Sequence, residues 1–250
     1  SVLLGSANPR KHMKSILSAC FPRCVRAFPL LFGVIIAPTV AHAQLVVFNF
    51  TGTSPGLNPP WTSTSTLESG ITLTGWTLGS VTGNSANNRF TATSWSLGTT
   101  FGDASSGNDY ITFSITPTSG NQLSLSGATI TYTLQNSGAG PDFYSIRSSV
   151  DNFGSDLSAS SSALTAAGGT TSTSLTLPTS VSYTGLTSAV EFRIYGWGAT
   201  GGTGTFSVNA WSMAGSVSAV PEPSTYAVIV GAVALAGAIL QRRRTRGAPR

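Results

Sequence analysis

The side chains that could do chemistry in the central part of this chain are carboxylates and hydroxyls. Between Gln44 and Val220 the sequence contains no histidine, no lysine and no cysteine. Nucleophilic sites built from serine with histidine, cysteine with histidine, or serine with lysine therefore cannot form there. Zinc sites made of histidine and cysteine are excluded for the same reason. What remains in this region is the chemistry of carboxylate pairs.

Hydrolysis of a glycosidic bond is the reaction that a carboxylate pair would support. It needs two carboxyl groups on either side of the sugar, roughly 5 to 10 Å apart. Glu68 with Glu191, or Asp103 with Asp109, could supply them. Most acidic residues of the region lie in or beside turns, where a solvated carboxylate is the default. We therefore expect a non-enzymatic protein, with a secreted carbohydrate-active enzyme as the alternative.

Oxygen-bearing side chains also gather at residues 102–109, whose sequence is GDASSGND. Carboxylate and carbonyl oxygens are the ligands that calcium prefers, which makes Asp103 and Asp109 candidate calcium ligands. The stretch lacks the alternating acids and the distal glutamate of an EF-hand loop. As a connection between two strands it needs no metal. We expect no cofactor, and calcium stays open as the alternative.

Aromatic side chains are the better candidates for ligand binding. Trp61, Trp95, Trp197 and Trp211, together with Tyr195, are many for a region so short of other large side chains, and the candidates for binding are Trp95, Tyr195, Trp197 and Trp211. The ring face of tryptophan is apolar and matches the C–H face of a sugar, while polar neighbours bond the sugar's rim. If exposed, these rings predict a glycan-binding surface. The alternative is that they belong to the core or rim of the fold.

Residues 44–219 read as a series of strands. Runs such as YITFSIT at 110 and VEFRIYGW at 190 place apolar side chains on alternate positions and are rich in threonine and aromatic residues. This pattern predicts strands with one buried face. About nine such runs separated by turns predict an all-β fold, an antiparallel β-sandwich of jelly-roll type. Residues 155–174 are the least patterned, and we expect a long surface loop there.

The predicted core consists of the apolar residues on the alternate positions of these runs. They are Val46, Phe48, Leu73, Trp76, Ile111, Phe113, Ile130, Tyr132, Ile146, Phe192, Ile194, Phe206 and Val208.

Charge is distributed unevenly along the 250 residues. The formal net charge is +5, but ten of the thirteen basic residues lie before residue 44 or after residue 240. Between these ends, three arginines stand against seven acidic residues, a net charge of −4. A basic face for phosphates is missing from this region, so we expect no nucleic-acid partner.

Residues 1–43 have the parts of a secretory signal peptide, with Met13 as the expected start. A basic front is followed by an apolar stretch and then by the small residues Ala41 and Ala43. This spacing predicts that signal peptidase cuts before Gln44. An N-terminal membrane anchor is the alternative, but the apolar stretch is shorter than a span of about 20 residues.

Residues 220–250 also have three parts. Pro221-Glu222-Pro223 holds the chain extended, because each proline fixes its own φ and disfavours helix in the residue before it. An apolar run then predicts a short transmembrane helix at about 225–240, which under-reaches a hydrocarbon core of about 30 Å. The basic tail at 242–250 would stay on the cytoplasmic side and leave residues 44–219 outside.

This order of motif, apolar helix and basic tail resembles the PEP-CTERM sorting signal of Gram-negative bacteria. The resemblance is carried by Pro221-Glu222-Pro223 and by Arg242-Arg243-Arg244, and it covers about thirty of the 250 residues. It implies recognition by an exosortase, which is a membrane-embedded cysteine transpeptidase. It also implies removal of the helix and transfer of the protein to the cell surface or an extracellular matrix, often in connection with exopolysaccharide.

The sequence therefore predicts an exported, non-enzymatic β-sandwich protein of the cell surface or extracellular matrix. We expect an association with exopolysaccharide or biofilm and weak affinity for glycans. The expected partners are signal peptidase, an exosortase, exopolysaccharide, and the membrane through the C-terminal helix before processing. Besides the enzyme, a plain tail-anchored periplasmic protein is an alternative, and it would keep its arginine tail.

Overall fold

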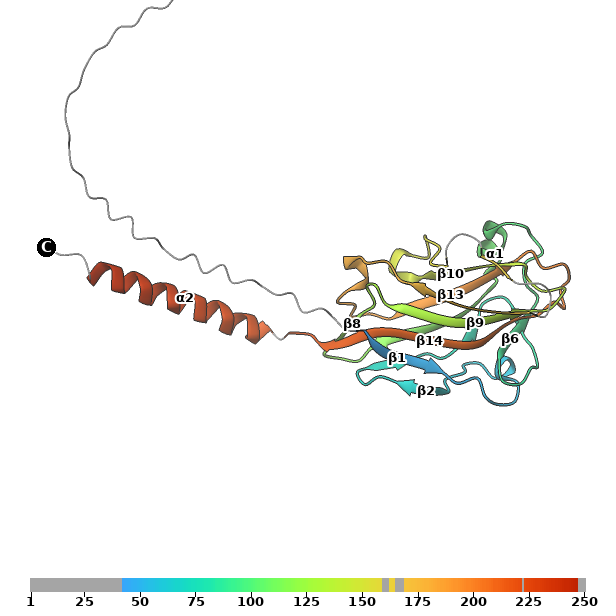
Figure 1. Cartoon of the computed structure of the whole chain (residues 1–250), viewed down its shortest axis with the longest axis horizontal. Helices are drawn as coiled ribbons and strands as arrows, with labels where there is room; N and C mark the ends of the chain where they lie inside the picture. Colours follow the sequence, from blue (N-terminus) through green and yellow to red (C-terminus); the bar gives the residue numbers. More distant parts are fainter. Residues whose placement is uncertain (1–41, 159–161, 165–168, 222, 247–250) are drawn as a thin grey trace, which may run out of the picture. The chain divides into compact units, whose positions relative to one another are not determined.

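The computed structural model describes residues 42–158, 162–164, 169–221 and 223–246, and two antiparallel sheets make up most of it (Figure 1). The strands of the larger sheet are β1 (Ala43–Phe48), β2 (Thr64–Leu67), β5 (Thr82–Gly83), β6 (Phe90–Thr93), β8 (Asn121–Ser124), β9 (Thr129–Asn136), β12 (Thr170–Thr176) and β14 (Phe206–Ala219). The strands of the smaller sheet are β3 (Ile71–Leu73), β4 (Thr77–Leu78), β7 (Tyr110–Pro117), β10 (Phe143–Ser148), β11 (Ser162–Ala163) and β13 (Val190–Trp197).

The described helices are few. They are α1 (Phe101–Gly107) and α2 (Pro223–Arg246), with short 3₁₀ turns η1 (Pro55–Leu57), η2 (Ser149–Asp151) and η3 (Val181–Tyr183). The larger sheet has the strand order β12-β9-β14-β1-β2, and the smaller sheet has the order β11-β10-β13-β7-β3. The prediction of an all-β sandwich is confirmed, while the jelly-roll connectivity stays a prediction.

Strand β14 is the longest strand described and pairs with four others. It lies between β1 and β9, and it also pairs with β6 near its start and with β8 near its end. The register places Trp211 opposite Phe48 of β1 and opposite Tyr132 of β9. One β-bulge interrupts the register with β9 between Val208 and Ala210. This single strand therefore aligns most of the larger sheet.

Aromatic rings from both sheets meet between them. Trp76 is fully buried, and its ring centroid lies 4.6 Å from that of Phe113 on β7 and 5.4 Å from that of Trp211 on β14. Aromatic pairs at such distances add to the stability gained from burial. The predicted core is confirmed, because every predicted residue is buried except Leu73, which is partly buried and packs against the same cluster.

Two segments differ from the sequence-based expectation. Residues 101–107 form helix α1 where a plain connection is expected, because a capping box at Thr100 starts a helix too short to show a helical period. The described part of the expected loop at 155–174 contains β11 and the start of β12. Strand β12 is almost all serine and threonine, so its two faces look alike in the sequence and the alternation is hidden.

The N-terminal boundary of the sandwich can be compared with the predicted cleavage site. Ala43 and Gln44 begin β1 and lie opposite Gly215 and Ala214 of β14. Residues 1–41 of the predicted signal peptide, which include Ala41, lie outside the described residues. Cleavage before Gln44 stays a prediction.

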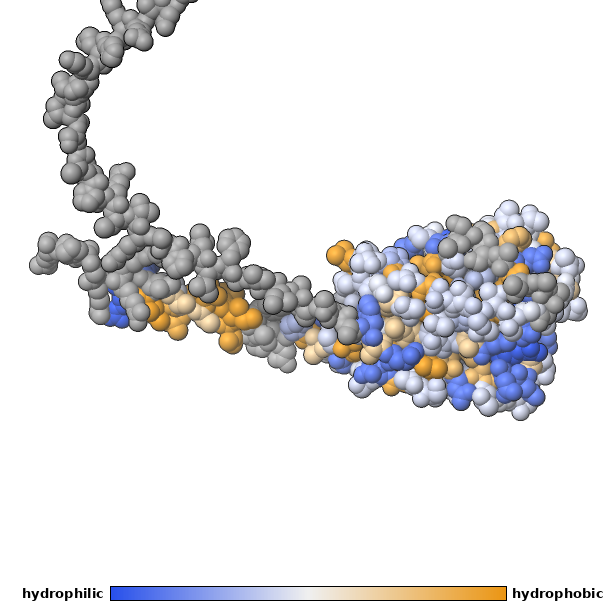
Figure 2. Space-filling view, in the orientation of Figure 1, coloured by the Kyte–Doolittle hydropathy of each residue, from blue (hydrophilic) through white to orange (hydrophobic). Residues whose placement is uncertain are grey.

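Helix α2 covers the apolar run of the tail. Its apolar side chains are exposed where they are described, for example Val228 at 71% and Val233 at 69% (Figure 2). Within the described part of the chain, however, no helix combines the length and hydropathy that a membrane crossing requires. The predicted transmembrane helix is therefore not confirmed.

Replacing Phe113 with alanine tests the aromatic core. The ring is 1% exposed and contacts Trp76, Trp211 and Phe192. We expect Phe113→Ala to lower the free energy of unfolding by about 3–5 kcal/mol, the usual cost of truncating a buried phenylalanine. Urea unfolding followed by tryptophan fluorescence measures this loss.

Leu97→Ala is the control, because Leu97 is 60% exposed. We expect this variant to change stability by no more than about 0.5 kcal/mol. Similar losses in the two variants would contradict the assignment of Phe113 to the core.

Candidate functional site

The four aromatic residues predicted to bind glycans are buried. Trp95, Tyr195 and Trp197 are each 3% exposed, and Trp211 is 1% exposed. Stacking on a sugar needs an accessible ring face, so these four rings offer no surface for it, and the alternative that they belong to the core or rim of the fold holds. The sequence could not show this, since the alternation of a strand does not say which of its faces another element covers.

The buried rings divide between two places. Trp211 belongs to the core, and Trp95 packs against Phe206 with ring centroids 5.1 Å apart. Tyr195 and Trp197 form a separate cluster under α1, where the ring centroid of Phe101 lies 5.2 Å and 6.0 Å from theirs. Helix α1, which the sequence pattern did not reveal, is the element that covers these two rings.

The two candidate calcium ligands stand at the two ends of α1. The carboxylate of Asp103 accepts hydrogen bonds from the hydroxyl of Thr100 at 2.7 Å and from its backbone N–H at 3.0 Å. These bonds lower the pKa of Asp103, whereas burial raises the pKa of Asp109. Among the described residues, no three histidine, cysteine, aspartate or glutamate side chains come together. Asp103 therefore has a structural role as a helix cap, and calcium binding there stays a prediction.

The candidate catalytic pair Glu68 and Glu191 is divided between the two sheets. Glu68 follows β2 of the larger sheet, whereas Glu191 lies in β13 of the smaller one. One carboxylate oxygen of Glu191 lies 2.7 Å from Nε of Arg193 and also accepts from the hydroxyl of Thr112 at 2.9 Å. This carboxylate faces a guanidinium group and a hydroxyl instead of a second acid.

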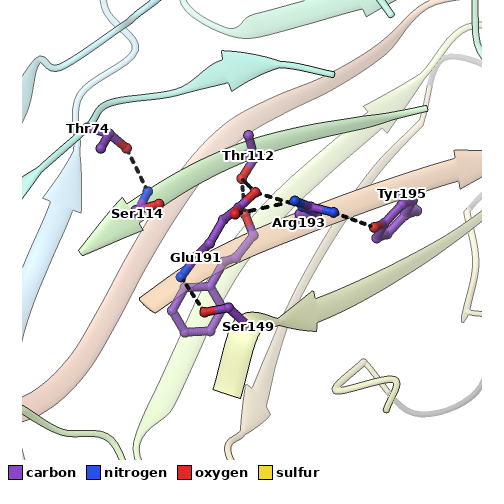
Figure 3. Close-up of polar contacts among 8 residues, drawn as sticks. Thr74, Thr112, Ser114, Ser149, Glu191, Arg193 and Tyr195 are labelled. Atoms are coloured by element: carbon purple, nitrogen blue, oxygen red, sulfur yellow. Dashed lines mark hydrogen bonds and ion pairs between the residues drawn. The ribbon is translucent and has the colours of Figure 1, made fainter. Parts of the chain in front are cut away.

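Arg193 is the centre of a network on the outer face of the smaller sheet. Figure 3 shows Glu191 and Arg193 together on β13, with Thr112 of the neighbouring strand bonded to Glu191. The guanidinium carbon of Arg193 lies 3.8 Å from the ring centroid of Phe153 and 4.4 Å from that of Tyr110. Burial disfavours its charge, but the hydrogen bonds to Glu191 and Tyr195 outweigh this effect and raise the pKa of Arg193.

Arg147 extends the same network toward α1. Its guanidinium carbon lies 3.6 Å from the ring centroid of Phe101, and Nη1 donates to the carbonyl oxygens of Phe153 and Gly154 at 2.9 and 2.6 Å. The two arginines together fasten α1 and the segment after η2 to the sheet. We call Arg147, Arg193 and the groups they contact a structural clasp, because both guanidinium groups bind other groups of the protein.

A polar pocket on the larger sheet is the feature that sequence reasoning missed. The register places Thr91 of β6, Ser207 of β14 and Gln135 of β9 next to one another. The pocket has a volume of about 130 Å³ and is lined by Arg89, Gln135, Asn136, Ser137, Thr205 and Ser207. These residues lie in β9 and β14 or directly beside β6, β9 and β14, which are far apart in the sequence. No local sequence motif therefore indicates the pocket.

Several polar atoms in and beside the pocket have no hydrogen-bond partner in the protein. Nη1 of Arg89 donates to Oε1 of Gln135 at 2.6 Å, and Nδ2 of Asn209 donates to the same oxygen at 3.1 Å. Nε of Arg89 and the Oδ1 atoms of Asn136 and Asn209 are buried without a partner. Buried polar groups are almost always paired, so a ligand or water is expected to complete this site.

The sorting residues are described only in part. Pro221 is exposed and comes two residues after the end of β14, and the N–H of Val220 still donates to the carbonyl of Gly120 at 2.9 Å. Arg242 is exposed. Glu222 and the side chains of Pro223, Arg243 and Arg244 lie outside the described residues.

Comparison with known proteins identifies no family for the chain. No family model matches it, and no curated protein matches it. Solved structures with similarity include the K3 adhesin domain of Lys-gingipain from Porphyromonas gingivalis W83, at 15% identity and a TM-score of 0.36 over 68% of this chain and 99% of that one.

Two further structures are similar at the same level. A Stig cyclase from Fischerella sp. TAU has 11% identity and a TM-score of 0.35, with 69% of this chain and 98% of that one covered. The N-terminal cellulose-binding domain of Cellulomonas fimi β-1,4-glucanase C has 12% identity and a TM-score of 0.29, with coverages of 59% and 90%. Similarity this low transfers no activity and no ligand to this chain.

Replacing Arg193 with methionine tests the structural clasp. The change keeps an apolar stem but leaves Glu191 without its ion pair and Phe153 without its cation. We expect Arg193→Met to lower the free energy of unfolding by about 1–2 kcal/mol, because the pair is only partly shielded from water. Urea unfolding at neutral pH measures the change. Arg193→Lys keeps the charge but not the planar stacking, and we expect an intermediate loss. An unchanged stability in Arg193→Met would contradict the clasp.

Replacing Asp103 with asparagine tests the capping box through its pH dependence. Because the pKa of Asp103 is lowered from its ordinary 3.8, its contribution to stability is complete above that pH and is lost as the pH falls through the folded-state pKa. We expect the advantage of the wild type over Asp103→Asn to shrink in acid. Urea unfolding over a pH series measures it.

Asp109→Asn is the control, because we expect its stability relative to the wild type to change with pH in the opposite direction. Burial raises the pKa of Asp109, so the stabilising effect of its neutral form is present below pH 3.8 and lost as the pH rises through the folded-state pKa. We expect this variant to gain stability relative to the wild type between acid and neutral pH. Two aspartates with responses of the same sign would contradict these assignments.

Proposed function

We propose that this chain is an exported, non-enzymatic protein of the cell surface or extracellular matrix, sorted by an exosortase and weakly binding glycans. The observation that carries the proposal is the way the sandwich ends. Strand β14 stops at Ala219, and the exposed Pro221 follows before α2 begins at Pro223. A processing enzyme would find the exposed Pro221 immediately outside the folded part.

In the tail beyond Val220, every side chain that the structure describes is exposed, so none of these side chains belongs to the core of the sandwich. The described side chains of α2 at residues 227–239 are all exposed, and they include valine, isoleucine and leucine. A large exposed apolar surface marks an interaction site or an aggregation risk. Contact with a membrane before processing, and removal of the helix afterwards, would account for such a segment.

A non-enzymatic role is supported by the chemistry available in the sandwich. Residues 44–220 lack histidine, lysine and cysteine, and Glu191 is engaged by Arg193. Figure 2 shows weakly hydrophilic residues over most of the face of the sandwich that it presents. A hydrated, weakly charged surface of serine and threonine suits a polysaccharide matrix, and the polar pocket on the larger sheet offers a place for sugar hydroxyls.

The intact mass of the protein recovered from native cells and matrix tests the sorting step. We expect a mature chain that begins at Gln44 and ends between Pro221 and Ser224. Recovery of chains that still carry residues 242–250 would contradict the proposal and favour a plain tail-anchored periplasmic protein. Peptide mapping of both termini locates the cuts.

A matched pair of variants separates processing at the motif from general proteolysis. The variant with Pro221, Glu222 and Pro223 all changed to alanine is expected to keep its tail. Pro178→Ala, outside the tail, is expected to be processed like the wild type. Turnover of a host polysaccharide by the wild type, lost in Glu191→Gln, would instead favour the enzyme.

A further inference from the structure

We propose that the pocket lined by Arg89, Gln135 and Asn136 binds a single neutral sugar unit through its hydroxyl groups. This inference deepens the proposed glycan affinity and rests on it. It places the binding site in a pocket whose lining has hydrogen-bonding side chains and no aromatic ring, instead of at the buried tryptophans.

The walls of the pocket are held in place by the backbone. The N–H of Thr205 donates to the hydroxyl of Ser137 at 2.8 Å, and the N–H of Ser137 donates to the carbonyl of Thr205 at 2.9 Å. A side chain at Gly204 would come within 1.9 Å of the carbonyl oxygen of Ala139, so only glycine lets these two turns approach. The pocket is therefore present before a ligand arrives, which lowers the entropic cost of binding.

A β-bulge brings one more amide to the same place. The register of β14 against β9 shifts between Val208 and Ala210, and the side chain of the residue between them, Asn209, reaches Gln135. Asn136 also lines the pocket, is 4% exposed, and uses its Nδ2 for the carbonyl of Pro141 at 2.8 Å. Its Oδ1 is left without a partner.

The unpaired atoms decide between classes of ligand. Nε of Arg89 is a donor, whereas the Oδ1 atoms of Asn136 and Asn209 are acceptors. An anion such as sulfate only accepts hydrogen bonds, so it would satisfy the arginine and leave both amide oxygens unpaired. A cation would be repelled by the guanidinium group. A hydroxyl group both donates and accepts, and a sugar carries several on one ring.

The size of the pocket limits what it can hold. About 130 Å³ is room for several water molecules, each of which needs about 10–15 Å³. A sugar whose hydroxyl oxygens replace these waters keeps their hydrogen bonds, which is the condition for displacing ordered water without losing affinity. Since no aromatic ring lines the pocket, stacking adds nothing and binding is weak.

Saturation-transfer difference NMR on the full chain tests the proposal. The probes are the methyl glycosides of glucose, galactose and mannose, with glucuronate and inorganic sulfate as the anions. Sulfate carries no protons, so its binding is measured as the loss of a glycoside or glucuronate signal in competition. We expect a signal from at least one neutral glycoside. Arg89→Met and Gln135→Met each remove a hydrogen-bonding group from the partly exposed wall and are expected to weaken that binding about tenfold.

Gln122→Met is the matched control. Gln122 is a half-buried glutamine on β8 of the same sheet, bonded to Ser218, and it does not line the pocket. We expect it to bind like the wild type. Thermal unfolding of all three variants shows whether each is folded, and Ser137→Ala replaces any pocket variant that is not.

Three results would overturn the proposal. Absence of a signal from every neutral glycoside with the wild type would mean that water alone fills the pocket. Equal binding by the pocket variants and the control would place the glycan affinity elsewhere on the protein. Stronger binding of glucuronate or sulfate than of any neutral glycoside would make this an anion site. None of these results affects the mass of the mature chain, so failure of the pocket and failure of the sorting proposal are distinguishable.

Discussion

The pairing of β14 is the constraint on which the rest of the structure depends. With both cysteines outside residues 44–220, no disulfide can hold this region, and burial and backbone hydrogen bonds must do so. Strand β14 pairs with β1, β9, β6 and β8, and it contributes Trp211 to the contact with Trp76 and Phe113 between the sheets. The start of the same strand lies at the polar pocket, and its end is where the tail begins.

The two sheets use their few arginines in different ways. On the smaller sheet, Arg147 and Arg193 stack on aromatic rings and bond a carboxylate and backbone carbonyls, which fastens α1 and the segment after η2. On the larger sheet, Arg89 bonds Gln135 but keeps Nε unpaired beside two unpaired amide oxygens. Arg147 and Arg193 thus stabilise the fold, whereas Arg89 has a buried donor that can bind a ligand.

The strands and core were largely predictable, because alternation over six to eight residues in runs such as β7 and β13 depends only on burial of one face. The candidate sites were much less predictable from the sequence. By residue type Asp103 is a candidate calcium ligand, and only the structure shows that its carboxylate caps the seven-residue helix α1. By residue type Tyr195 and Trp197 are candidates for stacking on a sugar, and only the structure shows that α1 covers them. The environment of all three residues depends on one short helix whose length is below the range in which periodicity can be read.

By itself, the sequence determined the fold class, the chemistry that the central region lacks, and the three-part order of the tail. These depend on residue type and local spacing, which do not change when the chain folds. Only the tertiary structure decided which aromatic rings are accessible, that Glu191 faces Arg193, and that Arg89, Gln135 and Asn136 share a pocket. The pocket brings together Arg89, which precedes β6, with residues of β9 and β14 more than forty and more than a hundred positions away. The register between such distant strands is set by packing of the whole sheet and leaves no local signal.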